Sequence, residues 1–313
     1  MRHLFQPYHE GPSAAPAQAR PQARPTRVGR FAETPGVPAV RRVYRVLCRL
    51  APGVAARLAY RQLATPPRGA AGRWPQAVRA QTRTRRLTCG TGELAVYEWG
   101  QGPVVLLVHG WGANATHMGR MVLPLVLAGF RVVAFDAPAH GRSSGLRTDM
   151  VEFANAVATV ARQVGPLHAV IGHSFGAAMA LYAARDWGLD STRLVLISSF
   201  DHCNWFVEMF ALHVGLTPEV RQRVRDMFVL RYGGRLDWGR MSVVEMARQA
   251  HLPTLLMHDD SDEEIPFSHG LSLAAALPAS QFKATHGLGH HRVVRNPEVI
   301  RRIVAFIEIQ ENP

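Results

Sequence analysis

Five short runs of apolar residues recur along the last two thirds of the chain, with helix-like patterns between them. The runs lie at 103–108, 131–136, 167–171, 193–199 and 253–258. Continuous apolar runs of this length are typical of strands that are buried on both faces of a sheet. Strands that alternate with helices pair mostly in parallel. The sequence therefore predicts an α/β protein with a mostly parallel, doubly wound sheet.

Weaker patterns complete the predicted α/β domain. Further strands are expected at 86–90, 94–99 and 281–285. The intervening helices are expected at 116–129, 148–164, 175–187, 267–277 and 297–309. One stretch, about 201–250, is helical in pattern throughout and interrupts the alternation of strands and helices. We interpret this stretch as a helical lid inserted into the sheet domain.

The positive charge of the chain is concentrated near its N-terminus. The net charge is +13, and residues 1–86 contain 17 arginines but only two acidic residues. Residues 1–37 are rich in Pro, Ala, Gln and Arg, which predicts a disordered basic tail. Residues 38–85 are predicted to form a basic helical extension and a linker. The α/β domain is then expected to occupy residues 86–313.

The helical extension has apolar and basic faces, which suggests two roles. Residues 38–64 place Val, Leu and Tyr on one helical face and arginines on another. Such helices can dock on the α/β domain with their arginine stems lying along it. They can also lie on an anionic membrane as a peripheral contact. Nucleic-acid binding is not favoured, because the pattern shows neither a groove nor aromatic residues interleaved with the charge.

Other features restrict the class of protein. The three cysteines, Cys48, Cys89 and Cys203, cannot form a disulfide framework and indicate a reducing compartment. No apolar run is long enough to form a transmembrane helix. The first twelve residues contain no apolar segment typical of a secretory signal. These observations predict a cytoplasmic location.

The most specific motif is Gly172-His173-Ser174-Phe175-Gly176, which directly follows one predicted strand and opens a helix. A serine on such a sharp strand-to-helix turn needs small neighbours, because the helix passes close to the sheet. The turn exposes the hydroxyl above the sheet edge, and the helix N-terminus favours negative charge developing there. Ser174 is therefore the candidate nucleophile.

A nucleophilic serine needs a base and an acidic group that orients the base. Two segments that follow predicted strands offer them in the order Ser…Asp…His. The candidate acids are Asp259, Asp260, Asp262, Glu263 and Glu264. The candidate bases are His286, His290 and His291. The residues alone leave this choice open.

Together these motifs resemble the α/β-hydrolase superfamily, in particular bacterial single-chain serine hydrolases with a G-H-S-x-G elbow and a short helical lid. His109-Gly110-Trp111-Gly112 is similar to the oxyanion motif of that family. Residues 135–143 resemble its D-x-x-G-x-G-x-S segment, with Ala139 where glycine is common. Residues 259–266 resemble its G-x-x-D-x-x-V-P pattern, although Asp259 stands where glycine is usual. Residues 287–290 match its G-x-G-H pattern.

The resemblance implies a Ser174–His290–Asp262 triad and an oxyanion hole formed by the backbone N–H groups of Trp111 and Phe175. It implies a serine hydrolase that cleaves a carboxylic ester or thioester through an acyl-serine, with no metal or organic cofactor. Two alternatives remain from the residues. One is an acyltransferase that passes the acyl group to an alcohol or amine, and the other is a catalytically silent binding protein of the same fold.

The predicted lid carries apolar side chains that suit a small-molecule acyl substrate. The residues expected to line this pocket are Trp205, Phe206, Met209 and Phe210. An apolar lid over the serine would form a pocket for the acyl chain. The same residues would also be expected if the lid helices only pack against each other.

Overall fold

The computed structural model describes residues 37–67 and 72–308. The predicted tail, residues 1–37, therefore lies outside the described residues except for Val37. Within them, eight strands form one sheet in the order β1-β2-β4-β3-β5-β6-β7-β8. The strands are β1 (Arg83–Cys89), β2 (Gly92–Trp99), β3 (Val104–Val108), β4 (Arg131–Phe135), β5 (Leu167–His173), β6 (Leu194–Ile197), β7 (Thr254–Asp259) and β8 (Ser280–Thr285).

The strand pairing confirms the predicted mostly parallel sheet. β3 to β8 pair in parallel, whereas β2 runs antiparallel to both β1 and β4. The four apolar strands β3, β4, β6 and β7 have almost entirely buried side chains, as expected of strands covered on both faces. Parallel pairing brings the carboxyl ends of β3, β5, β7 and β8 to the same edge of the sheet.

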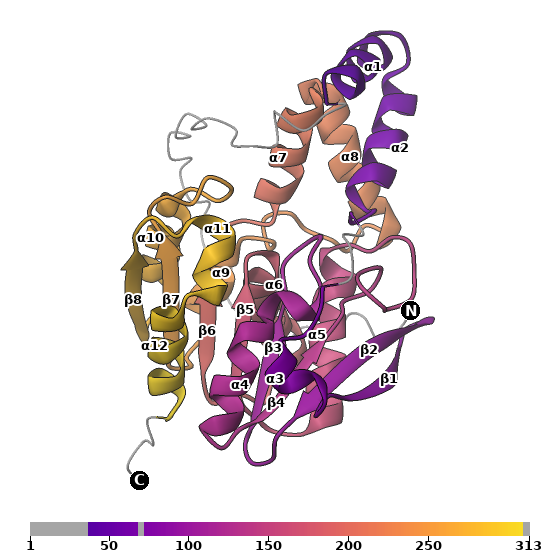
Figure 1. Cartoon of the computed structure of the whole chain (residues 1–313). Coiled ribbons are helices and arrows are strands. Elements are labelled where there is room, and N and C mark those ends of the chain that lie inside the picture. The colour runs from indigo at the N-terminus through magenta and orange to yellow at the C-terminus, as the bar shows by residue number, and fades with distance from the viewer. Residues whose placement is uncertain (1–36, 68–71, 309–313) are drawn as a thin grey trace.

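Helices cover both faces of this sheet (Figure 1). One face packs against α4 (Gly119–Leu127) and α12 (Pro297–Glu308), and the other against α5 (Met150–Val164) and α6 (Phe175–Trp187). The remaining short helices are α3 (Gln76–Arg79), α10 (Phe267–Ala276), α11 (Gly289–Arg292) and the 3-10 helices η2 (Ala115–Met118) and η3 (Val293–Arg295). No helix of the described ranges is long and apolar enough to cross a membrane.

The predicted insertion lies between β6 and β7 and is less helical than expected. It contains α7 (Asn204–Val214), α8 (Pro218–Arg231) and α9 (Val243–Arg248). Residues 232–242 contain no helix, because Gly233 and Gly234 adopt positive φ angles at the end of α8.

The linker predicted at the end of residues 38–85 also differs from the structure. It contains α3 and the first residues of β1, which begins at Arg83 and not at residue 86. β1 is an edge strand with mostly exposed side chains, so its sequence carries no apolar pattern. Its position is determined by backbone pairing with β2.

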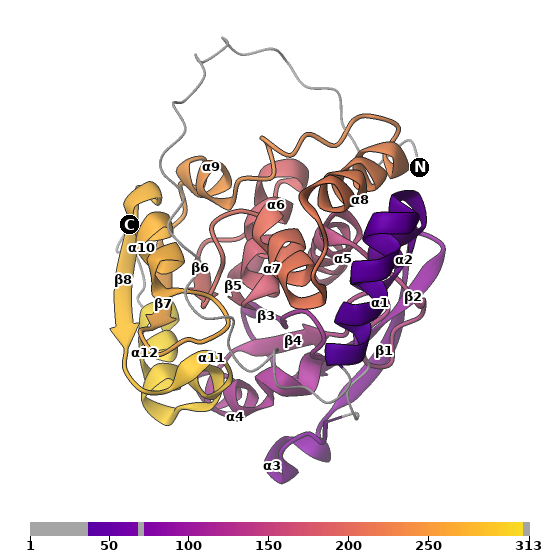
Figure 2. The ribbon, with the colours of Figure 1, turned by 90° about the horizontal axis from the view of Figure 1, so that it is seen from above.

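The basic extension forms α1 (Val37–Leu50) and α2 (Pro52–Leu63), which stand beside α7 and α8 away from the sheet (Figures 1 and 2). We call these four helices the cap. Arg41 donates through Nε to the carbonyl of His213 at 2.8 Å and through Nη2 to that of Leu212, at the C-terminal end of α7. Tyr60 of α2 packs edge-on against Phe228 of α8, with ring centroids 4.8 Å apart. The extension thus docks mainly on the insertion.

Candidate active site

Ser174 lies on a strained turn between β5 and α6. Its backbone has φ 56° and ψ −123°, a conformation that residues with a side chain rarely adopt. Small neighbours permit it: a Cβ on Gly172 would lie 2.5 Å from the Cα of Ala177. A Cβ on Gly176 would lie 2.3 Å from the carbonyl oxygen of His109. The structure therefore has the strand–turn–helix geometry that the motif predicts, with a half-buried serine at its apex.

His290 and Asp262 form a buried hydrogen-bonded pair. Nδ1 of His290 lies 2.7 Å from Oδ2 of Asp262, and both side chains are almost inaccessible. Oδ1 of the same carboxylate accepts from the backbone N–H groups of Glu264 and Ile265, each at 2.9 Å. Burial alone would raise the pKa of Asp262, but the hydrogen bond and positive charge of His290 hold it below its usual value. The carboxylate is thus kept ionised beside the imidazole.

The other candidate acids and bases pair differently. Asp260 contacts His286 at 2.6 Å, and both side chains are exposed. His291 contacts Glu264 at 2.8 Å, and this hydrogen bond raises the pKa of His291 despite its partial burial. Among these groups, only Asp262 and His290 form a buried pair at the edge that carries Ser174.

Two side chains to which the sequence analysis assigned no anchoring role hold the His290 segment in place. Asp259, at the end of β7, is fully buried, and its carboxylate accepts from the N–H groups of Leu288 and Gly289 and from the hydroxyl of Thr285. His173 contacts the carbonyl of His290 through Nε2 at 2.9 Å. The residue before the serine and the end of β7 therefore both fix the backbone around His290.

Replacing Asp259 with alanine is expected to lower the free energy of unfolding by about 3–5 kcal/mol, because three partly buried donors, those of Thr285, Leu288 and Gly289, lose their acceptor. It should also lower kcat/KM for any substrate, because His290 loses its support. Urea unfolding and steady-state kinetics would measure both effects. Asp260→Ala is the matched control at the neighbouring exposed position and should leave stability unchanged. Equal behaviour of the two variants would contradict the anchoring role of Asp259.

The segment after β3 lies directly beside the serine. A Cβ on Gly110 would lie 3.1 Å from Cβ of Ser174 and 3.5 Å from its Oγ. Trp111 follows, and its ring lies 5.1 Å from that of Phe175, measured between centroids. The N–H of Phe175 is the first of α6, so it has no partner within the helix. The two predicted oxyanion residues thus lie on adjoining segments around Ser174.

Two histidines, His109 and His140, form hydrogen bonds with the backbone around this segment. His109 accepts at Nε2 from the N–H of Ala137, and its Nδ1 lies 2.7 Å from the carbonyl of Gly110. This arrangement requires the neutral tautomer with the proton on Nδ1. His140 likewise accepts at Nε2 from the N–H of Gly112 at 3.0 Å. Both rings therefore hold the backbone around the site by hydrogen bonds.

Two buried histidines give stability a predictable pH dependence. Burial lowers the pKa of His109 to about 4, and burial together with the nearby His290 lowers the pKa of His173 well below its usual value. In the unfolded chain a histidine binds a proton below about pH 6.5. The unfolded state therefore binds more protons between about pH 6.5 and 4, so stability must fall as the pH falls through that range.

Each of these histidines should contribute about 1.4 kcal/mol of destabilisation per pH unit, or about 2.8 kcal/mol per pH unit for the two. Urea unfolding between pH 7.5 and pH 5 would measure the slope. His109→Asn is expected to make the slope smaller by about 1.4 kcal/mol per pH unit, whatever its effect on absolute stability. An unchanged slope in this variant would contradict a neutral, buried His109.

The four predicted pocket residues lie on α7, and their side chains reach two different neighbourhoods. Phe206 of α7 packs against both Trp111 and Phe175, with centroids 4.8 Å and 5.0 Å away. Trp205 turns instead to His269 of α10, 4.5 Å away. Met209 and Phe210 are half-buried further along α7. Only Phe206 thus has a ring contact with the residues around the serine.

Comparison with known proteins supports the fold. Residues 103–228, which include β3, the elbow and α7, match the family model described as alpha/beta hydrolase fold. The chain has the α/β-hydrolase fold. Alignments with two curated relatives cover most of the length of those relatives. A non-heme haloperoxidase of Rhodococcus erythropolis is 26% identical over 69% of this chain and 96% of its own.

A bifunctional esterase/perhydrolase of Acinetobacter calcoaceticus is 25% identical over 67% of this α/β-hydrolase and 94% of its own chain. Among solved structures, an esterase of Pyrococcus furiosus superposes with a TM-score of 0.60 at 19% identity. It covers 78% of this chain and 96% of its own. At that identity the structural likeness shows the fold alone.

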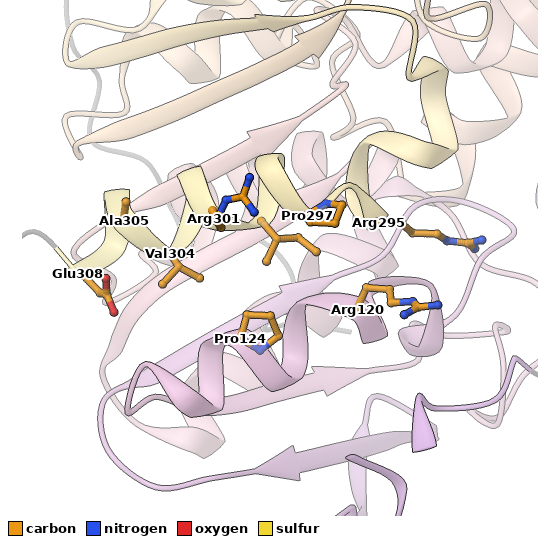
Figure 3. A pocket seen from close by; sticks show the side chains of 9 residues that line it. Arg120, Pro124, Arg295, Pro297, Arg301, Val304, Ala305 and Glu308 are labelled. Carbon is orange, nitrogen blue, oxygen red and sulfur yellow. The ribbon is translucent and has the colours of Figure 1, made fainter. Parts of the chain in front are cut away.

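The α/β-hydrolase also has a surface groove that is separate from this site. It lies between α4 and α12, on one face of the sheet, and has a volume of about 610 Å³ (Figure 3). Its lining residues are Arg120, Pro124, Arg295, Pro297, Ile300, Arg301, Val304, Ala305 and Glu308. The lining contains no nucleophile beside a base, so we assign no chemistry to it.

Proposed function

We propose that this α/β-hydrolase is a serine hydrolase that cleaves a carboxylic ester or thioester through an acyl-serine intermediate. The observation that carries the proposal is the placement of Ser174 on its strained turn at the same sheet edge as the buried His290–Asp262 pair. The esterase named among the relatives supports ester hydrolysis as the class of reaction. In that class the nucleophile, the base and the group orienting the base act together.

The proposed reaction begins with attack of Ser174 Oγ on the substrate carbonyl carbon while Nε2 of His290 takes the hydroxyl proton. Asp262 holds the proton on Nδ1 and stabilises the imidazolium. The N–H groups of Phe175 and Trp111 donate to the oxyanion, and each such donor contributes about 3–4 kcal/mol in related sites. The tetrahedral intermediate collapses, and the alcohol or thiol leaves with the proton from His290. Water then attacks the acyl-serine by the same steps, releasing the carboxylic acid and free Ser174.

The substrate is proposed to have an apolar acyl part. The rings of Trp111, Phe175 and Phe206 pack together beside the serine, and two of them belong to the proposed oxyanion residues. An acyl chain entering there would meet aromatic surface on the lid side. Phe206 is the one lid residue with ring contacts to both, so its size should limit the acyl chains accepted.

Hydrolysis of p-nitrophenyl esters from short to long acyl chains tests the proposal, together with labelling by a fluorophosphonate. We expect turnover with an optimum chain length and a single label, found on Ser174 by mass spectrometry. Labelling of Ser174 without hydrolysis would favour transfer of the acyl group to an alcohol or amine. Neither labelling nor turnover would indicate a silent binding protein and overturn the proposal.

A further inference from the structure

The outer surface of α1 carries a stripe of exposed apolar side chains. Val43, Val46 and Leu50 are 55%, 53% and 80% exposed, whereas Tyr44 and Cys48 on the opposite side of the helix are buried in the cap. Helical spacing places the three exposed residues on one side of α1. Single exposed apolar residues are common on proteins, but an aligned set on one helix marks an interaction surface.

A basic stripe runs beside the apolar one. Arg42, Arg45 and Arg49 are exposed on α1 next to the apolar stripe. Within the described ranges, none of these three guanidinium groups pairs with a carboxylate. The segment 37–67 contains six arginines and no acidic residue. The surface of α1 therefore offers apolar contact and uncompensated positive charge side by side.

α2 repeats the same combination. Val54 and Leu58 are 44% and 45% exposed, and Arg57 and Arg61 are exposed with them. Figure 1 shows α1 at the end of the cap farthest from the sheet, with α2 descending from it. The surface is therefore free to meet a large partner without obstruction by the sheet domain.

We propose that the exposed apolar and basic side chains of α1 and α2 form a docking face for the surface of an anionic lipid bilayer. The apolar stripe would enter the boundary between headgroups and acyl chains, and the arginines would contact the lipid phosphates, their stems lying along the boundary. A bilayer matches both properties of the face. A nucleic acid would leave the apolar stripe in water, so charge alone would recognise it. The proposal does not depend on the chemistry at Ser174.

Flotation of the full chain with phosphatidylcholine vesicles, with and without phosphatidylglycerol, tests the proposal. We expect binding to the mixed vesicles, at least about tenfold weaker binding to pure phosphatidylcholine, and a decrease with added salt. The double variant Val46→Glu, Leu50→Glu should lose about tenfold or more in partitioning. The matched control is Leu127→Glu, Leu271→Glu, which changes exposed leucines on α4 and α10 and should bind as the unaltered chain does.

The basic stripe is tested separately by replacing Arg42, Arg45 and Arg49 together with glutamine. Partitioning to mixed vesicles should again fall about tenfold or more. The control is the triple glutamine variant of Arg248, Arg301 and Arg302, which removes the same charge from α9 and α12. Equal loss in this control would show that net charge alone binds vesicles and would overturn the proposal.

Two further outcomes would also overturn it. One is absence of vesicle binding by the full chain. The other is a dimer, measured by light scattering, that dissociates in the Val46→Glu, Leu50→Glu variant, because the face would then be covered by a second copy. Circular dichroism melting of each variant confirms folding, and the exposure of the replaced side chains makes unfolding unexpected.

Discussion

Replacement of Ser174 with alanine is expected to lower kcat for p-nitrophenyl esters by about 10⁶-fold and to abolish fluorophosphonate labelling. Without the hydroxyl no acyl-serine can form, and the remaining donors can only polarise the carbonyl for direct attack by water. The fold should be unaffected, because alanine is smaller and the strained turn is imposed by the strand and helix that flank it. Hydrolysis assays with long incubation times would measure the residual kcat, and mass spectrometry after fluorophosphonate treatment would measure the labelling.

Ser198 offers a matched control for this experiment. It follows β6 at the same sheet edge and also has a positive φ of 50°, but its hydroxyl is fully buried. Ser198→Ala should keep kcat within a few fold of the unaltered enzyme. Retained turnover in Ser174→Ala, or a label found on another serine, would refute the proposed nucleophile.

Replacement of Asp262 with asparagine is expected to lower kcat by about 10⁴-fold while the protein remains folded. The amide would donate to Nδ1 of His290, so the imidazole proton would lie on Nε2. That nitrogen could then not accept the proton of Ser174. Steady-state kinetics with a short-chain ester would measure the loss, and circular dichroism would confirm the fold.

Asp260→Asn is the control for the choice of acid. Its carboxylate contacts His286 on the surface, 2.6 Å away, and is not joined to His290. We expect kcat within a few fold of the unaltered value. A large loss in this variant with little change in Asp262→Asn would reassign the acid to Asp260.

The sheet could be predicted from sequence because burial on both faces leaves a continuous apolar run. α6 was predicted at its observed bounds, since the elbow marks its start and Gly188 ends it. The strand predicted at 86–90 overlaps β1, but its first residues were missed, because they have no apolar pattern and are placed by pairing with β2. The short helix α3 was missed altogether. Periodicity grouped the Val, Leu and Tyr side chains of α1 on one face, whereas in the structure Tyr44 is buried and Val43 and Leu50 are exposed. An apolar stripe does not specify which part of it another surface will cover.

The candidate site was predictable only in part, for a similar reason. The elbow is a local motif, so Ser174 could be identified from five consecutive residues. The choice among five neighbouring carboxylates depends on the turn after β7, where the N–H groups of Glu264 and Ile265 fix Asp262 toward His290. The anchoring role of Asp259 depends on amides almost thirty residues away, which no local pattern reveals.

The cap is built from two segments that lie far apart in the chain, and this has a consequence for biosynthesis. Leu63, the end of α2, and Pro218, the start of its partner α8, are separated by 155 positions in the chain (63 to 218). At translation rates of about 5–20 residues per second, α2 must wait roughly eight to thirty seconds on the ribosome for α8 to be synthesised. During that time the face of α2 that packs on α8 is uncovered. Nascent chains that end before α8 should therefore be bound by chaperones more strongly than chains that include it.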